Sequence, residues 1–316
     1  MEKILEIKNL TKTFGKKTVV NNLSFDIYPG EICGFLGPNG SGKTTTIKMI
    51  VGLLQPNNGS VSICGNNIKT NFEEALANVG AIVENPDTYK EFSGRQNIML
   101  AANICKASPE RQQEVIDIVG LTKRIDEKVK KYSLGMKQRL GIAIALLSKP
   151  KLLIFDEPTN GLDPTGIKDF RETIKHLAHE EGIGVLISSH MMSEMELICD
   201  KIVIIEKGEL LGVNSLSDIK LGLTESVEVT YKITVNDSET ICKVLRGNDN
   251  DIELKVEDII VRDIRLKEIS FNTSIEKIPE LVKKLVENGV QVWSARPVET
   301  SLEDAYFDAT GGGQIA

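Results

Sequence analysis

The first segment whose residue types and spacing could do chemistry is GPNGSGKT, residues 37–44. Its glycines would let backbone N–H groups converge on phosphate oxygens, Lys43 would reach the β and γ phosphates, and the Thr44 hydroxyl could bind Mg²⁺. A helix beginning at the end of this segment would turn its positive end toward the same anion. The predicted phosphate loop with the residue after it consists of Gly37, Pro38, Asn39, Gly40, Ser41, Gly42, Lys43, Thr44 and Thr45.

Two adjacent carboxylates form the second chemical feature. Asp156 and Glu157 directly follow the apolar run 151–155, which is typical of a buried strand. If that strand ends beside the phosphate loop, Asp156 can hold Mg²⁺ directly or through water. Glu157 would then face the attacking water as a general base, so the pair divides the work that phosphate hydrolysis requires.

Strands and helices must alternate to bring these segments together. The run 31–36 reads as a buried strand that leads into the phosphate loop, and a helix with one apolar face follows it. Further strands are predicted at 4–8, 19–27, 79–83, 151–155, 184–188 and 201–206, and helices at 96–104, 109–119, 133–147 and 168–180. This alternation predicts an α/β domain with a mainly parallel sheet.

The distribution of charge predicts a second domain. The 316 residues carry a formal net charge of −7, all of which falls on residues 221–316, because residues 1–220 hold equal numbers of acidic and basic side chains. The predicted domains are therefore 1–220 and 221–316. The second reads as a small α+β domain, with strands at 226–235 and 266–271 and a helix at 274–288.

Composition excludes several classes of protein. An acidic chain is a poor match for a phosphate backbone, so no nucleic acid is expected as a partner. The longest apolar stretch, residues 140–147, is far shorter than a membrane-spanning helix requires. The first residues alternate like a strand and lack the pattern of a signal peptide, so we expect a cytoplasmic protein. Five scattered cysteines without a CxxC pair favour reduced thiols over disulfides or zinc.

A third motif, YSLGMKQR at residues 132–139, lies between the other two, with Ser133 placed to cap a helix. With GPNGSGKT before it and LLIFDEPTNGLDP after it, residues 4–212 resemble the nucleotide-binding subunit of an ATP-binding cassette (ABC) transporter. The resemblance implies a P-loop NTPase cassette with a mainly parallel sheet, an antiparallel β subdomain and a helical subdomain. It also implies an ATPase with ATP and Mg²⁺ as cofactors.

The resemblance assigns roles to residues of one subunit. Phe14 resembles the aromatic residue that stacks on adenine. Residues 37–44 resemble the Walker A loop, and Asp156 with Glu157 resembles the Walker B pair. His190, after the predicted strand 184–188, resembles the switch histidine near the γ-phosphate and the attacking water.

Other residues are implied to act across a dimer. Ser133 and Gly135 resemble the signature residues that contact the γ-phosphate of ATP held by the opposite subunit, and Asp163 belongs to the D-loop. The resemblance therefore implies that two copies, or one copy and a related subunit, close on ATP. Leu134 and Met136 depart from the usual LSGGQ signature, which leaves the serine and backbone contacts possible but removes the glutamine side chain.

The other departure is Glu84, where the family usually has a glutamine that helps to bind Mg²⁺. Glutamate in the run IVENPDTYKEFSGRQN resembles the bacitracin-resistance and lantibiotic-immunity branch. This implies export of a drug or peptide antibiotic through a separate transmembrane permease, which would dock between Glu84 and about Asn97. The subunit would then lie on the inner face of the membrane.

Two other classes of function are weighed against transport. A non-transport ABC ATPase acting on DNA or ribosomes would need a long coiled coil or a second cassette, and this chain has neither pattern. A module that uses ATP only as a conformational clamp would not need the base Glu157 or His190. The role of the C-terminal domain, as a dimer contact or a regulator, stays open.

Overall fold

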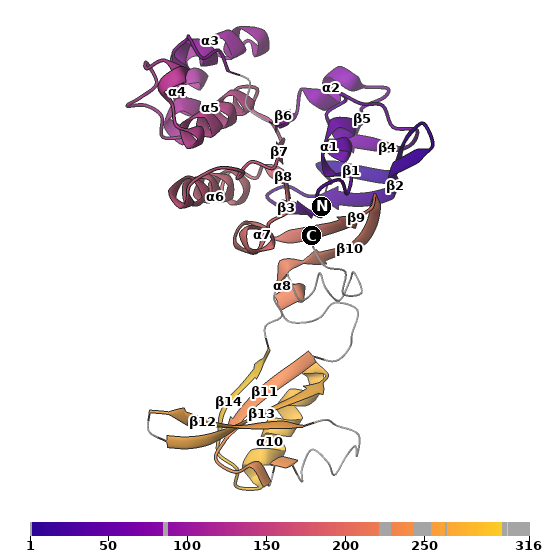
Figure 1. Ribbon diagram of the computed structural model, residues 1–316, viewed down its shortest axis with the longest axis vertical. Helices are drawn as coiled ribbons and strands as arrows, with labels where there is room; N and C mark the ends of the chain where they lie inside the picture. The colour runs from indigo at the N-terminus through magenta and orange to yellow at the C-terminus, as the bar shows by residue number, and fades with distance from the viewer. Residues whose placement is uncertain are drawn as a thin grey trace. The chain divides into compact units, whose positions relative to one another are not determined.

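The computed structural model describes residues 2–84, 88–220, 229–239, 241–242, 254–262, 264–298 and 302. The chain divides into two compact units between Val213 and Asn214 (Figure 1). The first unit contains all the motifs named above. The second contains the small sheet and helix of the acidic region.

A six-stranded sheet in the order β10-β9-β3-β8-β7-β6 forms the centre of the first unit. Strands β6, β7, β8, β3 and β9 pair in parallel, which confirms the predicted mainly parallel α/β fold. All residues of β3, β7 and β8 are buried, which explains their apolar runs. The bounds are β3 Ile32–Leu36, β6 Val79–Ile82, β7 Leu152–Asp156, β8 Gly184–Ser189, β9 Lys201–Glu206 and β10 Glu209–Ser215.

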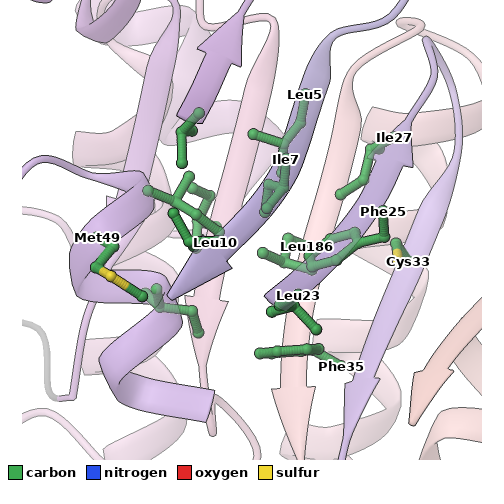
Figure 2. Close-up of a cluster of buried hydrophobic side chains, with 14 of the residues drawn as sticks. Leu5, Ile7, Leu10, Leu23, Phe25, Ile27, Cys33, Phe35, Met49 and Leu186 are labelled. Carbon is green, nitrogen blue, oxygen red and sulfur yellow. The ribbon is translucent and has the colours of Figure 1, made fainter. Parts of the chain in front are cut away.

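An antiparallel sheet in the order β2-β1-β4-β5 is the second layer of this unit. Its strands are β1 Leu5–Phe14, β2 Lys17–Ile27, β4 Asn58–Ile63 and β5 Asn66–Asn67, and helix α2 (Phe72–Leu76) follows. Helix α1 (Lys43–Ile50) packs with both sheets in one apolar core (Figure 2). The Phe25 and Phe35 ring centroids lie 5.5 Å apart there, one from each sheet.

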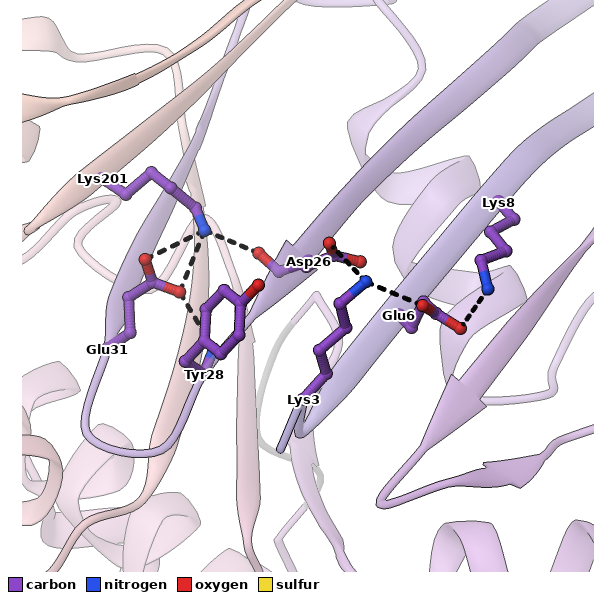
Figure 3. Close-up of polar contacts among 7 residues, drawn as sticks. All are labelled: Lys3, Glu6, Lys8, Asp26, Tyr28, Glu31 and Lys201. Atoms are coloured by element: carbon purple, nitrogen blue, oxygen red, sulfur yellow. Dashed lines mark hydrogen bonds and ion pairs between the residues drawn. The ribbon is translucent and has the colours of Figure 1, made fainter. Parts of the chain in front are cut away.

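Polar contacts also join the two sheets at one end (Figure 3). The Lys201 ammonium on β9 lies 2.9 Å from a Glu31 carboxylate oxygen and donates to the Asp26 carbonyl at 2.7 Å. The Lys3 ammonium bridges the carboxylates of Glu6 and Asp26 at 2.8 and 2.9 Å. These contacts fix the end of β2 that leads into β3.

Helices α3 (Gly94–Cys105), α4 (Pro109–Ile118) and α5 (Leu134–Leu146) form a separate helical group of the first unit (Figure 1). Serines 93, 108 and 133 cap their N-termini, each accepting a backbone N–H three residues ahead. Helix α6 (Pro164–His179) begins four residues earlier than predicted, because the Asp163 side chain caps it and Pro164 fits its first turn. A short helix, α7 (Met192–Ile198), follows β8.

The second unit contains an antiparallel sheet in the order β12-β13-β11-β14. Its elements are α8 Leu216–Lys220, β11 Val229–Val235, β12 Lys255–Val261, β13 Ile264–Thr273, α10 Ile278–Glu287 and β14 Val292–Pro297. Leu285 of α10 packs in a core with Ile233, Ile269 and Phe271. The predicted strand at 226–235 starts in residues outside the described ranges. The helix begins at Ile278 instead of residue 274, because residues 275–277 form a 3₁₀ turn ahead of Pro279.

Within the described residues, no helix is both long and apolar enough to cross a bilayer. All five cysteines are free, and only Cys33 and Cys199 are buried. Burial raises the pKa of the Cys33 thiol to about 12, so this thiol is protonated in the core at neutral pH.

Candidate functional site

The phosphate loop connects the carboxyl end of β3 to α1, as predicted. Gly42 adopts a φ of +108° at the helix N-terminus, and a Cβ there would lie 2.8 Å from the Val19 carbonyl oxygen. A Cβ at Gly37 would lie 2.3 Å from the Ile205 carbonyl oxygen. These two positions therefore require glycine, because neighbouring backbone leaves no room for a side chain.

Lys43 is buried and folds back over the loop, where its ammonium donates to the Gly37 carbonyl at 2.6 Å. The Ser41 hydroxyl is also buried, and among the described residues it has no hydrogen-bond partner. A buried hydroxyl without a partner costs free energy unless a ligand satisfies it. A phosphate oxygen fits this need, and the loop thus combines a cation, a free hydroxyl and a helix N-terminus.

The carboxylate pair ends β7, and Ser188 of the adjacent β8 holds it. The Ser188 hydroxyl donates to Asp156 Oδ1 at 2.6 Å and accepts the Glu157 backbone N–H at 2.9 Å. Glu157 has a φ of +49°, a conformation that costs free energy for a residue other than glycine. Ser188 is a residue that the sequence analysis missed as part of the site.

The Glu157 carboxylate lies between the side chains of Lys43 and His190, both of which were predicted from the sequence as site residues. One carboxylate oxygen is 3.2 Å from the Lys43 ammonium, and the other is 2.9 Å from His190 Nδ1. The Glu157 side chain is only 19% exposed. The structure thus brings Lys43, Glu157 and His190 into one cluster, with the carboxylate at its centre.

A cavity of about 260 Å³ lies beside this cluster. It brings together the three residues predicted as metal ligands, Thr44, Glu84 and Asp156. Its lining residues are Thr44, Glu84, Leu134, Gln138, Asp156, Glu157, Pro158 and Asn160. Gln138, Pro158 and Asn160 were not selected from the sequence, although all three lie inside the motifs that were quoted.

Glu84 forms an ion pair with Lys48 of α1, with 2.8 Å between the ammonium and a carboxylate oxygen. The hydrogen bond and the positive charge of Lys48 lower the pKa of Glu84. Glu84 is therefore a carboxylate at neutral pH. Throughout the described ranges, no three His, Cys, Asp or Glu side chains gather closely enough to form a metal centre without other ligands.

Phe14 lies at the end of β1, and the residue is 49% exposed. The Lys12 ammonium lies 5.1 Å from the ring centroid. An exposed aromatic ring that is held at a strand end can stack on a planar base.

Ser133, Gly135 and Asp163 are not among the residues that contact the Glu157 carboxylate, which are Lys43 and His190 among the residues that the structure describes. Ser133 caps α5 by accepting the Met136 N–H, and Asp163 caps α6 by accepting the Gly166 N–H. Both side chains are exposed. Within the described part of the chain, none of the three lines the cavity or contacts Lys43.

A parallel sheet with a phosphate loop after one strand and a carboxylate pair after another defines a P-loop nucleotide-hydrolysing domain. Residues 20–160 match the ABC transporter family. The chain is 43% identical over 312 residues to the ABC transporter ATP-binding protein YhcH of Bacillus subtilis, covering 98% of this chain and 97% of that protein. The chain belongs to the family of ABC transporter ATP-binding subunits.

Two further relatives extend the comparison. The bacitracin transport ATP-binding protein BcrA of Bacillus licheniformis is 39% identical over the full length of both chains. A solved dimer of an ATP-binding cassette in a post-hydrolysis state with ADP and Pi is 25% identical, with a TM-score of 0.60 over 67% of this chain and 98% of that one. The chain is accordingly an ATP-binding subunit and an ATPase.

Replacing Ser188 by alanine is expected to lower kcat for ATP hydrolysis about tenfold and to change the Kd for ATP little. The variant loses the bonds that orient the Asp156 carboxylate and the Glu157 backbone, and a misplaced catalytic group lowers the rate more than ground-state binding. Steady-state kinetics and calorimetric ATP titration measure the two effects. Ser189→Ala is the matched control, because Ser189 is equally buried and, among the described residues, its hydroxyl accepts only the Met191 N–H. An equal loss of kcat in both variants would contradict the positioning role.

Proposed function

We propose that this chain energises the export of a drug or peptide antibiotic through a separate transmembrane permease. The observation that carries the proposal is the cluster of Lys43, Glu157 and His190 in a chain that matches a bacitracin transport ATP-binding protein from end to end. The ATPase site supplies the energy. The similarity to the bacitracin transport protein over the full length of the chain supports a drug or peptide antibiotic as the cargo. Residues 1–220 would form the ATPase domain and residues 221–316 an accessory domain.

Within one subunit, the phosphate loop from Gly37 to Thr45 binds the phosphates of ATP, and Phe14 stacks on the adenine. Thr44, Asp156 and Glu84 would hold Mg²⁺, which when bound neutralises phosphate charge. Glu157 accepts the proton of the attacking water, and His190 orients the Glu157 carboxylate through its Nδ1 contact. The buried Ser41 hydroxyl and the shared cavity support this assignment.

Hydrolysis requires a second copy, or a related subunit, in this proposal. Ser133 and Gly135 contact the γ-phosphate of ATP held by that partner, and Asp163 lies at the contact between the two. Two observations support the arrangement. The Ser133 and Asp163 side chains are exposed, and a solved relative with this fold is a dimer with ADP and Pi.

The permease would dock on the segment from Glu84 to about Asn97, and the subunit would lie on the inner face of the membrane through that contact. The Tyr89 and Phe92 side chains support this site. Both rings are exposed, and their centroids lie 5.5 Å apart in that segment. Exposed aromatic groups of this kind are typical of protein interfaces.

Loss of the chain from its source cells is expected to make them more sensitive to bacitracin, because a permease without its ATPase cannot export. Minimal inhibitory concentrations measure the effect. Expression of the wild-type chain should restore resistance, and expression of Glu157→Gln should not. Unchanged sensitivity to bacitracin and lantibiotics, with an active ATPase in vitro, would refute the proposed cargo class.

A further inference from the structure

The ion pair between Lys48 and Glu84 connects the helix after the phosphate loop to the segment after β6. Thr44 and Lys48 are four residues apart on α1, so they share one face of this helix. Glu84 follows β6 with a φ of +68° and lines the cavity that Thr44 and Asp156 also line. The Lys48 ammonium contacts the Glu84 carboxylate at 2.8 Å.

The position of this pair distinguishes it from an ordinary surface ion pair. Two further acidic residues, Asp156 and Glu157, line the same cavity. The Lys43 ammonium already contacts one Glu157 carboxylate oxygen, and His190 Nδ1 lies 2.9 Å from the other. Lys48 is therefore the cation that balances the third carboxylate.

We propose that Lys48 is a positioning residue that holds the Glu84 carboxylate and thereby sets how much Mg²⁺ strengthens the binding of ATP. This inference rests on the proposed function of the site. A free carboxylate is a stronger Mg²⁺ ligand than an amide. While Lys48 contacts Glu84, the two side chains together have no net charge. In this respect the pair resembles the uncharged glutamine that is more usual at position 84.

Removal of Lys48 and removal of the Glu84 charge are expected to change Mg²⁺ binding in opposite directions. Without Lys48, the Glu84 carboxylate is free and attracts Mg²⁺ more strongly. Without the Glu84 charge, the Lys48 ammonium remains beside the cavity and repels the metal. A pair that served only the stability of the fold would not give shifts of opposite sign.

The experiment measures the ratio of two dissociation constants for a non-hydrolysable ATP analogue, one without Mg²⁺ and one with it, by calorimetry on the full chain. Lys48→Met is expected to raise this ratio about three- to tenfold, since one unit charge acts at a partly exposed site. Glu84→Gln is expected to lower the ratio by a similar factor. The double variant Lys48→Met with Glu84→Gln should return close to the wild-type ratio.

Lys284 and Glu280 form the matched control pair. Their charged atoms lie 3.0 Å apart with side-chain exposures of 44% and 72%, against 38% and 64% for Lys48 and Glu84, and neither Lys284 nor Glu280 lines the cavity. Lys284→Met and Glu280→Gln should leave the ratio unchanged. Thermal unfolding of each variant without nucleotide checks that it is folded.

Ratios within twofold of wild type in both single variants, with normal binding of the analogue, would overturn the inference and leave the proposed function standing. If the wild-type chain bound no analogue with or without Mg²⁺, the proposed function itself would fail. Shifts of the same sign in both variants would also overturn the positioning role.

Discussion

Replacing Glu157 by glutamine is expected to slow ATP hydrolysis by about 10²- to 10⁴-fold, because the substitution removes the proposed general base. Glutamine preserves the size of the side chain and can still contact His190. Binding of ATP should persist, since the phosphate loop and Lys43 are unchanged. Phosphate release under single-turnover conditions measures the rate, and titration with ATP measures the affinity.

The same variant tests whether two copies of the chain close on ATP. With hydrolysis blocked, Mg²⁺-ATP should shift the solution mass from that of a monomer to that of a dimer. Glu172→Gln is the control, because Glu172 lies on α6, is exposed and, within the described ranges, pairs only with Lys168 at 3.7 Å. An unchanged hydrolysis rate in Glu157→Gln would sink the assignment of the base.

Replacing Lys43 by alanine is expected to weaken ATP binding about ten- to hundredfold. A hydrogen bond to a charged group contributes about 1.5–3 kcal/mol, and each 1.4 kcal/mol changes an affinity tenfold. To bind a phosphate, the ammonium exchanges its contacts with the Gly37 and Pro38 carbonyls and with the Glu157 carboxylate. Calorimetric titration with ATP and Mg²⁺ measures the loss.

Lys130→Ala is the control for Lys43→Ala, since it removes the same charge from an exposed position. Its affinity for ATP should equal that of the wild type. Lys43→Ala also leaves Glu157 without its cation, so thermal unfolding must confirm that the variant folds. A folded Lys43→Ala protein with wild-type affinity would contradict the phosphate-loop assignment.

The parallel strands could be predicted because they are fully buried. A short, continuous apolar run such as residues 152–155 is typical of a central strand that is buried on both faces. Strand β4 escaped prediction because only Val61 and Ile63 of its residues are buried. Strand β5 has two residues, both asparagine, and carries no periodic signal.

The candidate site was predictable wherever its residues lie within one motif. The phosphate loop, Asp156 and Glu157 follow from local spacing. Ser188 did not, because its contact with Asp156 spans 32 residues and depends on the pairing of β7 with β8. Its signal was present as two serines at the end of a buried strand, where a buried hydroxyl requires a partner.

The contact between Lys48 and Glu84 also spans 36 residues of sequence. No local pattern joins a lysine in a helix to a glutamate after a distant strand. Glu84 was selected through its place in a family pattern, which says nothing of the charge that faces it. Long-range electrostatic partners of this kind become visible only when the sheet has been assembled.

The place of β3 between β8 and β9 determines when the ATP site can form during synthesis. Gly34 pairs with Ile187 on one side and with Ile202 on the other, so both neighbours of this strand are made more than 150 residues later. A nascent chain that carries the complete phosphate motif therefore lacks both strands that pair with β3. Because a ligand stabilises only a state that can bind it, we expect ATP to stabilise the fold only after the chain through Glu206 has been made. Nucleotide is then expected to act on an assembled sheet and not on shorter nascent chains.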